Sequence, residues 1–334
     1  MKNEIQNQQK SAKSPKATKI SLLVILILLG LVIVIIFVFA VGIYGFDWSN
    51  KFTQRVEKII PYPVALTNYT FIPYSAYNFD LTTLIYYYQS LARSGEGTIS
   101  PSQENLDKAV LKRLIRNEVT KQIAADYRVK VEKLELQQEM QKIINQSDTP
   151  ENAEKTLQQL YNWTVDQYRD HVLYYYLLRN KLQEKLSYDD SLAYNIEAKK
   201  RAQEVLDKVK TNADTFENLA NNFSEDLTAD NGGNLGYITR GQMVTEFEEA
   251  AFKLKKDEVS DLIRTKYGFH IIKLLNIKGE GETEQREVSH ILIKTQDLDE
   301  FINDKLNDTR VYIFKKNMKW DKTTGEAVFP AIQK

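Results

Sequence analysis

The stretch Tyr267-Gly-Phe-His-Ile-Ile-Lys-Leu-Leu-Asn-Ile-Lys-Gly-Glu-Gly-Glu-Thr-Glu-Gln-Arg-Glu-Val-Ser-His-Ile-Leu-Ile-Lys294 holds two apolar runs joined by a loop with two glycines. Short runs rich in Ile, Leu and Val and bounded by glycine are typical of buried β-strands. A glycine-containing loop between two such runs favours a reversal of the chain. The stretch therefore predicts two antiparallel neighbouring strands, over residues 267–275 and 288–293.

Each predicted strand carries one histidine, and the two histidines are placed symmetrically about the loop. The midpoint between His270 and His290 is Glu280, which lies between the two glycines. A symmetric hairpin folded at Glu280 would set His270 directly opposite His290. Directly opposed side chains point to the same face of a sheet. We therefore expect the two imidazoles to meet on one face.

The sequence before this hairpin shows helical patterns from about residue 190. A helix is expected near 191–210, and Asp214 can cap a second helix. Gly232-Gly233 marks a tight turn. A third helix is expected where apolar residues recur at helical spacing, at Val244, Phe247, Ala251 and Leu254. Helices that precede and interrupt the strands predict an α+β domain over residues 186–295.

Four motifs within this domain resemble the parvulin (rotamase) family in order and spacing. They are Phe223-Ser-Glu-Asp226, Asn231-Gly-Gly-Asn-Leu-Gly-Tyr237, Arg240-Gly-Gln-Met-Val-Thr-Glu-Phe-Glu-Glu-Ala-Ala-Phe252 and Tyr267-Gly-Phe-His-Ile-Ile272. Several separated motifs at compatible distances are a more specific signal than a single glycine pattern. The resemblance implies a four-stranded antiparallel sheet with helices, and peptidyl-prolyl cis/trans isomerase activity.

Isomerisation of an Xaa-Pro bond needs no covalent step, because its barrier of about 18–20 kcal/mol comes from amide resonance. A catalyst must favour the twisted amide, with an apolar socket for the proline ring and polar groups around the carbonyl. The resemblance implies four catalytic positions, which are His270, His290, Asp226 and Thr265. It also implies four substrate-binding positions, which are Met243, Phe247, Leu235 and Gln242. Met243 and Phe247 lie four residues apart and would share one helix face, although spacing alone fits an ordinary core equally well.

The chain departs from the parvulin pattern at the start of the domain. Parvulins begin with a strand that carries His-Ile-Leu, but the matching stretch Leu186-Ser-Tyr-Asp-Asp-Ser191 has neither a histidine nor a strand pattern. Residues 288–294 resemble that strand, displaced to the end of the domain. Two explanations stay open, a second truncated parvulin repeat and a circularly permuted domain. We favour permutation, because the family's first and last strands lie side by side, and predict that 287–294 pair antiparallel with 269–275.

The region before the parvulin motifs is expected to be mostly helical, after a short strand at 64–71. Helical patterns occur near residues 103–127, 130–145 and 151–161. Thr164 and Gln167 form a capping-box pattern before a further long helix. The region resembles the substrate-binding part of SurA- and PrsA-type chaperones. Its two tyrosine runs, 86–88 and 174–176, could line a groove for unfolded polypeptide or pack as ordinary helix faces.

Residues Ile20 to Phe46 contain no charged side chain and are almost all apolar. As a helix they would extend about 40 Å, more than the roughly 30 Å hydrocarbon core of a bilayer. Five lysines precede this span against a single acidic residue, which favours a cytoplasmic N-terminus. The apolar region of a cleaved signal peptide is only about 7–15 residues long, so we expect an uncleaved anchor.

The composition argues against several kinds of site. Lys+Arg and Asp+Glu both number 45, so the formal net charge is zero and no basic footprint points to nucleic acid. The chain has no cysteine, which excludes disulfides and thiol catalysis. It has only three histidines, so we expect neither a metal site nor a cofactor.

Together these patterns predict an α+β protein in five parts. The parts are a cytoplasmic tail (1–19), a transmembrane anchor (20–46), a helical chaperone domain (47–185), a parvulin domain (186–295) and a C-terminal extension (296–334). We expect the protein to isomerise Xaa-Pro bonds in unfolded or nascent polypeptides outside the cytoplasm and to hold such chains, while one transmembrane helix keeps it at the cell membrane. The first alternative is a non-catalytic holdase that uses the parvulin fold to bind peptides, and the second is a scaffold that uses the helical domain alone. Acidic residues follow Lys294, so we do not expect recognition of phosphorylated substrates.

Overall fold

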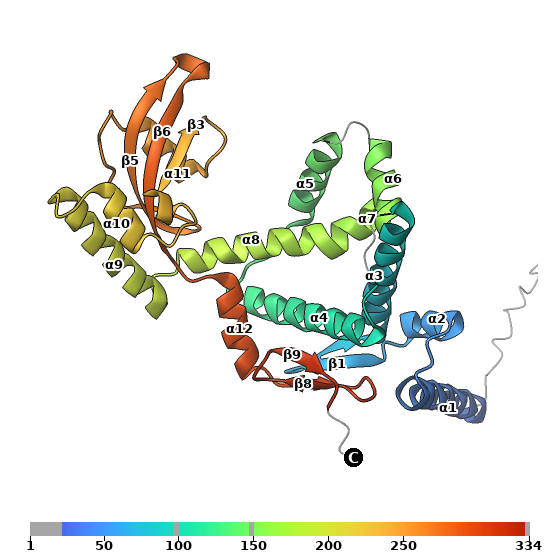
Figure 1. Cartoon of the computed structure of the whole chain (residues 1–334). Coiled ribbons are helices and arrows are strands. Elements are labelled where there is room, and N and C mark those ends of the chain that lie inside the picture. The colour runs from blue at the N-terminus through green and yellow to red at the C-terminus, as the bar shows by residue number, and fades with distance from the viewer. Residues whose placement is uncertain (1–21, 96–99, 147–149, 331–334) are drawn as a thin grey trace, which may run out of the picture. The chain divides into compact units, whose positions relative to one another are not determined.

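A computed structural model of the chain describes residues 22–95, 100–146 and 150–330 (Figure 1). The expected tail over residues 1–19 lies outside the described residues. The chain divides into two compact units, Met1–Tyr62 and Pro63–Lys334. Each unit is described by itself.

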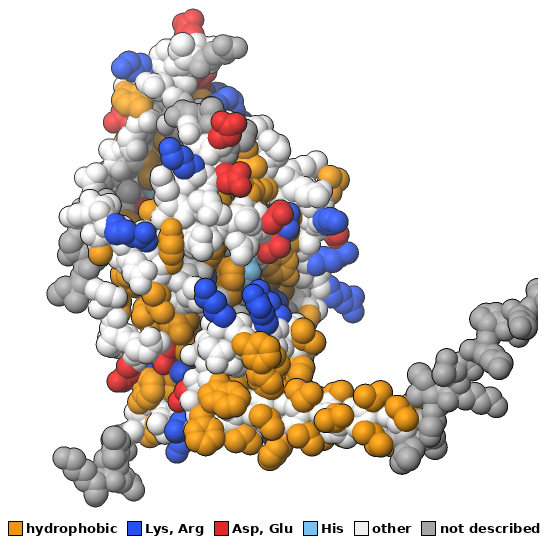
Figure 2. Space-filling view, turned by 90° about the vertical axis from the view of Figure 1, so that its right-hand side faces the viewer, with side chains coloured by type: hydrophobic (Ala, Val, Ile, Leu, Met, Phe, Trp, Pro, Cys, Tyr) orange, Lys and Arg blue, Asp and Glu red, His pale blue; other side chains and the backbone are white. Residues whose placement is uncertain are grey.

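The first unit holds two helices, α1 (Leu22–Phe46) and α2 (Lys51–Ile59). Residues Val24–Phe46 of α1 have a mean hydropathy of 3.7. Most of their side chains are exposed, although Gly42 and Ile43 near the end of the helix are buried. Among the described residues, α1 is the one helix that is long and apolar enough to cross a membrane. Figure 2 shows it as a rod with hydrophobic side chains along its length. An apolar helix that is exposed along most of its length fits a lipid environment, so the expected anchor has the required physical character.

The second unit begins with a hairpin and continues with helices. The expected single strand at 64–71 is wrong, because β1 (Pro63–Thr67) turns back at Asn68, which has φ of 52°, into β2 (Thr70–Pro73). The helices that follow are α3 (Tyr74–Ser94), α4 (Gln103–Asp126), α5 (Lys133–Gln146), α6 (Pro150–Tyr161), α7 (Val165–Tyr168) and α8 (Tyr174–Ser187).

The last long helix of this region is continuous except for one π-helical turn at Arg169–Leu173, which joins α7 to α8. Its start confirms the predicted capping box: Gln167 N donates to Thr164 Oγ1 over 3.2 Å, and Thr164 N donates to Gln167 Oε1 over 2.8 Å. His171 lies in the π-helical turn and stacks on Phe79, with ring centroids 4.1 Å apart. This histidine is therefore a packed residue of the helical region.

The predicted four-stranded antiparallel sheet is confirmed. Its strands lie in the order β3-β6-β5-β4 and are β3 (Asn234–Ile238), β6 (Gln285–Lys294), β5 (Gly268–Lys278) and β4 (Ile263–Thr265). Three helices accompany the sheet, α9 (Ala193–Lys210), α10 (Phe216–Phe223) and α11 (Thr245–Lys253). The mixed helix-and-sheet class that the sequence predicts is therefore the class observed.

The sheet separates two hydrophobic cores because its strands alternate their side chains between faces. On one face, Phe269, Ile271, Ile291 and Ile293 pack with apolar residues of α9 and α10. On the other face, Ile272, Leu274 and Val288 pack with Phe247 and its neighbours on α11. His270 and His290 lie two residues from members of this second set on the same strands, so their side chains also face α11.

The predicted pairing of residues 287–294 with 269–275 is confirmed, but the predicted register is wrong. His290 lies opposite Ile272, and His270 lies opposite Leu292. The turn occupies the residues between Lys278 and Gln285 and includes a short 3₁₀ turn at Gly281–Thr283, so the reversal is centred later than Glu280. The resulting offset is two residues, an even number, so both histidines stay on one face as diagonal neighbours.

The chain leaves the helical region after α8 and returns to it after β6. These two connecting segments, the first and second passages, are joined by hydrogen bonds. Asn195 Nδ2 donates to Leu186 O over 2.7 Å on the first passage, and Asn195 Oδ1 accepts from Gln296 N over 2.7 Å on the second. Gln183 also bonds the second passage, because its Nε2 donates to Gln296 O over 3.0 Å and its Oε1 accepts from Leu298 N over 2.7 Å.

The C-terminal extension packs against the helical region. It forms α12 (Leu298–Asp308), β7 (Val311–Ile313), β8 (Lys319–Asp321) and β9 (Glu326–Val328). Asp299 of α12 pairs with Arg116 and Arg179, each over 2.8 Å. β7 pairs antiparallel with β1, which gives a three-stranded sheet of order β2-β1-β7. The first and last parts of the second unit therefore share one sheet.

Candidate functional site

The two histidines of the central strands form a buried pair on the α11 face of the sheet. His270 Nδ1 and His290 Nδ1 are 3.2 Å apart. Their rings are stacked, with centroids 5.5 Å apart and planes 16° apart. This contact confirms the prediction that the two side chains meet. They meet as diagonal neighbours, a separation that aromatic side chains can span.

A hydroxyl and a carboxylate close the two ends of this pair. Thr265 on β4 has its Oγ1 2.9 Å from His270 Nε2 and also accepts from Tyr267 N over 3.1 Å. At the other end, His290 Nε2 lies 3.2 Å from Asp226 Oδ1. If the Thr265 hydroxyl donates to His270, then His270 donates from Nδ1 to His290, and His290 donates from Nε2 to Asp226. Every imidazole nitrogen of the pair then has a partner of the opposite kind, a donor for each acceptor and an acceptor for each donor.

Thr228 supports Asp226 and was not found from the sequence. Its Oγ1 donates to Asp226 Oδ1 over 2.6 Å, and its backbone N donates to the same oxygen over 2.9 Å. Thr228 Oγ1 also lies 3.4 Å from His290 Nε2. A threonine two residues after an aspartate is a common turn pattern, so nothing in the sequence distinguishes this one from a loop residue.

The ionisation of the network follows from its burial. Burial, and then the neighbouring His290, lower the pKa of His270 to about 3, although Asp226 opposes this shift. Burial also lowers the pKa of His290, against the influence of Asp226. Burial alone would raise the pKa of Asp226, but hydrogen bonds from Thr228 and His290 outweigh it and hold this pKa at about 2. At neutral pH the site therefore contains two neutral imidazoles and one carboxylate.

Apolar side chains flank the imidazoles. Phe247 on α11 meets both rings edge to face, with centroids 5.3 Å from His270 and 5.6 Å from His290. Leu235 and Met243 are half-buried and pack against the same core. Met243 is not helical as expected, because Val244 is the N-cap and α11 begins at Thr245. It instead reaches the site from the turn before the helix.

A cavity of about 680 Å³ opens in front of this cluster. Seven of the eight residues singled out by the parvulin resemblance line it, namely Asp226, Leu235, Gln242, Met243, Phe247, His270 and His290. The eighth, Thr265, lies behind His270 and contacts it through the hydrogen bond described above. The structure thus brings all eight together, while their catalytic and binding roles remain predictions.

Gln242 stands at the exposed edge of the cavity. Its Oε1 accepts from Thr239 N over 2.8 Å, so the carbonyl end of this side chain stabilises the turn before α11. The NH₂ group of the Gln242 side chain would then be the part that can contact a bound peptide.

Part of the cavity wall comes from outside the parvulin motifs. Gln183 of α8, Tyr194 of α9 and Glu300 of α12 line it, together with Asp297 before α12. No motif or periodicity marks these residues, because their place depends on how the two passages of the chain run beside the sheet. Among the described residues, no group of three or more His, Cys, Asp and Glu could hold a metal ion.

Two family models match the chain. The SurA-like N-terminal domain matches residues 5–183, and the PPIC-type PPIASE domain, named Rotamase, matches residues 182–276. The second match ends before β6 begins at Gln285.

Foldase proteins named PrsA are among the relatives. The chain is 42% identical over 107 residues to foldase protein PrsA of Bacillus subtilis, an alignment that covers 32% of this chain and 35% of that protein. It is 42% identical over 113 residues to foldase protein PrsA 1 of Bacillus cereus, which covers 30% and 40%. It is 28% identical over 208 residues to foldase protein PrsA of Staphylococcus aureus strain Newman, which covers 54% and 65%. The chain thus spans less than two thirds of the length of these relatives.

Solved structures of PrsA proteins also match. Peptidylprolyl isomerase PrsA from Bacillus anthracis is 24% identical with a TM-score of 0.20, and the match covers 58% of this chain and 84% of that one. Foldase protein PrsA from Streptococcus pneumoniae is 20% identical with a TM-score of 0.22, over 58% and 73%. The SurA-like N-terminal domain model covers more than half of the sequence, so the chain belongs to the SurA-like N-terminal domain family and carries a PPIC-type PPIase domain after it.

Proposed function

We propose that this protein catalyses cis/trans isomerisation of Xaa-Pro bonds in unfolded polypeptides and holds such chains at the outer face of the cell membrane. The observation that carries the proposal is the neutral His270–His290 pair, bound to Asp226 and set beside an apolar cavity wall. The PPIC-type match and the PrsA relatives support the same function.

The cavity suits the two demands of amide rotation. Met243, Phe247 and Leu235 offer an apolar surface for a proline ring, and a poorly hydrated wall favours the twisted amide, which has lost much of its dipole. Asp226 remains a carboxylate at neutral pH. Negative charge beside the substrate carbonyl disfavours the charge-separated resonance form that stiffens the C–N bond. The histidines would hold Asp226 in place and remain uncharged.

Exchange spectroscopy on an Xaa-Pro peptide with the full chain in detergent tests the catalytic part. We expect accelerated cis/trans exchange, and a loss of most of that acceleration in Met243→Ala and Phe247→Ala. Met318→Ala is a matched control, because Met318 is buried outside the cavity. Unchanged exchange in both cavity variants would refute the site assignment.

The holdase without catalysis is the second candidate. It is favoured by the end of the PPIC-type match at residue 276, which leaves the strand of His290 outside the matched segment. Full-length protein that suppresses aggregation of an unfolded client, but leaves peptide exchange at the uncatalysed rate, would establish it. Suppression that is lost when the helical region is altered, for example by Tyr176→Ser, would place the holding surface there, since Tyr176 is exposed on α8.

The membrane orientation is part of the proposal. The lysines before α1 favour a cytoplasmic N-terminus, which would place both the helical region and the cavity outside the cytoplasm. Protease added outside intact cells should then degrade the second unit.

A further inference from the structure

The three-stranded sheet β2-β1-β7 has one covered face and one open face. Ala65, Thr67 and Ile72 are buried on the covered face, which lies against the helical region. On the open face, Leu66 of β1 pairs directly with Phe71 of β2 and with Tyr312 of β7. Three large apolar side chains therefore form a row across all three strands.

The open face is aromatic and strongly exposed. Tyr69 is 92% exposed, Phe71 60% and Tyr312 57%. Phe314 follows Tyr312 at the next position of the same parity and is also exposed. We call these four residues, with Leu66, the aromatic face. Side chains of this size are seldom left in water as a contiguous row unless they contact another surface.

The segment that carries Tyr312 and Phe314 has charged side chains of one sign. Residues Arg310-Val-Tyr-Ile-Phe-Lys-Lys-Asn-Met-Lys319 include four cationic and no acidic side chains, and the strands β1 and β2 contain no charged residue. Arg310, Lys316 and Lys319 are exposed. Tyrosine and phenylalanine flanked by lysine and arginine are the side chains enriched where proteins meet anionic lipid headgroups.

The chain connects the aromatic face to a membrane helix by a short tether. β1 begins at Pro63, and α1 ends at Phe46. α2 occupies nine residues of this tether, so its full extension is roughly 40 Å. β1 is the first element after the tether and the central strand of this sheet. Of all the strands and helices of the second unit, this sheet is thus the one closest along the chain to the bilayer that α1 would enter.

The helix α2 within the tether exposes side chains of the kinds found at membrane surfaces. Phe52 and Ile59 of α2 are exposed and lie seven residues apart, on one side of the helix, with the exposed Arg55 between them. A short helix with aromatic, aliphatic and basic residues on its open side is typical of the bilayer interface.

We propose that the aromatic face docks on the headgroup region of an anionic phospholipid bilayer, the same bilayer that α1 crosses. The proposal rests on the membrane anchorage in the proposed function and is independent of the isomerase activity. Tyr69 and Tyr312 would insert their rings at the interface, and Arg310, Lys316 and Lys319 would bind lipid phosphates.

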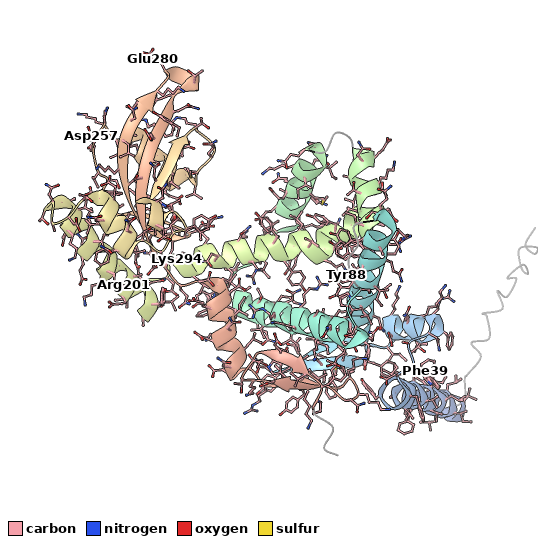
Figure 3. The ribbon with its side chains drawn as sticks, viewed as in Figure 1. Phe39, Tyr88, Arg201, Asp257, Glu280 and Lys294 are labelled. Carbon is pink, nitrogen blue, oxygen red and sulfur yellow. The ribbon has the colours of Figure 1, made fainter. Side chains whose placement is uncertain are left out.

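The absence of cysteine makes the test direct. Tyr69→Cys and Tyr312→Cys are each labelled with an environment-sensitive fluorophore in the full chain, reconstituted in vesicles of phosphatidylglycerol and phosphatidylcholine. Glu280→Cys is the control, because Glu280 lies at the tip of the β5–β6 hairpin (Figure 3). We expect lipids with a nitroxide near the headgroup to quench the labels at 69 and 312 at least twofold more than the label at 280. Replacing phosphatidylglycerol with phosphatidylcholine should reduce the difference.

Other outcomes overturn the proposal and identify the alternative. Equal quenching at all three positions, in protein that floats with the vesicles, would show that the face does not dock. A fluorescence change that appears only with added unfolded polypeptide would assign the face to client binding. A change that grows with the number of proteins per vesicle would assign it to a second copy of this chain. Failure to float with the vesicles would remove the membrane anchorage, whereas the peptide-exchange assay would be unaffected.

Discussion

The residues of the cavity are arranged so that a single hydrogen-bond direction runs from Thr265 through both histidines to Asp226. Each imidazole then uses one nitrogen as a donor and the other as an acceptor, and neither needs a second proton. The carboxylate at the end carries the one negative charge. We infer that the network places Asp226 and keeps it ionised, while burial keeps the imidazoles neutral.

Removing the Thr228 hydroxyl tests how much Asp226 depends on its support. In Thr228→Val the 2.6 Å hydrogen bond to Asp226 is lost, while the backbone donor stays. A hydrogen bond to a charged group contributes about 1.5–3 kcal/mol, so we expect kcat/KM for an Xaa-Pro peptide to fall roughly tenfold. The pKa read from the acid limb of the pH–rate profile should rise. Thr228→Ser keeps the hydroxyl and should restore both values; equal loss in both variants would mean that Thr228 acts only through packing.

The buried histidines also make stability depend on pH. The pKa of His270 is about 3 in the folded chain and about 6.5 in an unfolded one. Between these values the unfolded chain binds more protons, so stability is full above pH 6.5 and falls as the pH drops. Each such histidine contributes a slope of up to about 1.4 kcal/mol per pH unit. Asp226 adds to the loss only below its ordinary pKa of 3.8, because its folded pKa is about 2.

Denaturant unfolding of the sheet at pH 7 and at pH 5 measures this slope. In His270→Gln the fall in stability between the two pH values should be clearly smaller than in the unaltered chain. An unchanged slope would mean that other groups dominate the acid response.

At the scale of elements, β6 determines the geometry of the site because it lies between β3 and β5 and carries His290. The loop that leads into β3 approaches β6 closely at Gly233. Gly233 has φ of 72°, its O accepts from His290 N over 2.9 Å, and a Cβ there would lie 2.0 Å from His290 O. The loop before β3 therefore fixes the position of the β6 backbone at His290.

Gly233→Ala should displace β6 and reduce both stability and peptide exchange. Gly236→Ala is the matched control, since Gly236 has φ of 70° but nothing within 4 Å of an added Cβ. Both variants strain the backbone, by about 1 kcal/mol, and only the first meets a neighbouring strand. Equal effects of the two, measured by thermal unfolding and by peptide exchange, would contradict this account.

Some features of these elements could be predicted from the sequence and others could not. The pairing of β5 with β6 follows from two apolar runs and a glycine loop, and the shared face of the histidines follows from an even spacing. The register does not follow, because a loop of several residues can place its centre at more than one position. The turn at Asn68 and the non-helical Met243 depend on local backbone geometry, and the wall formed by Gln183 and Glu300 depends on tertiary packing, which no pattern along the chain records.

At the scale of the whole second unit, the isomerase-like sheet and the helical region are joined by two adjacent passages rather than one. The C-terminal extension belongs structurally to the helical region, through α12 and β7, while β6 belongs to the sheet. The position of β6 after β5 agrees with the permutation that we favour, which remains a prediction.

Truncated chains test whether β6 stabilises the sheet and whether the C-terminal extension stabilises the helical region. A chain that ends at residue 297 keeps all four strands of the sheet, so amides of β5 should stay protected from hydrogen exchange, while α4 loses its contacts with α12 and β9 and should become less protected. A chain that ends at 284 lacks β6, which leaves one edge of β5 without partners, and the protection of β5 should disappear. Protected β5 amides in the shorter chain would show that another segment replaces β6.

The place of β6 in the chain also sets an order of events during synthesis. Ribosomes deliver a protein from its N-terminus, so the helices α1 to α11, β3 and β5 are all made before β6, the strand that joins β3 to β5. Figure 3 shows Lys294, the last residue of β6, at the end of the hairpin opposite Glu280. Until that residue is available, the cavity has no His290 and its wall stays open. A growing chain of this protein would therefore acquire its site late, because neither β3 nor β5 has its central partner strand until β6 is made.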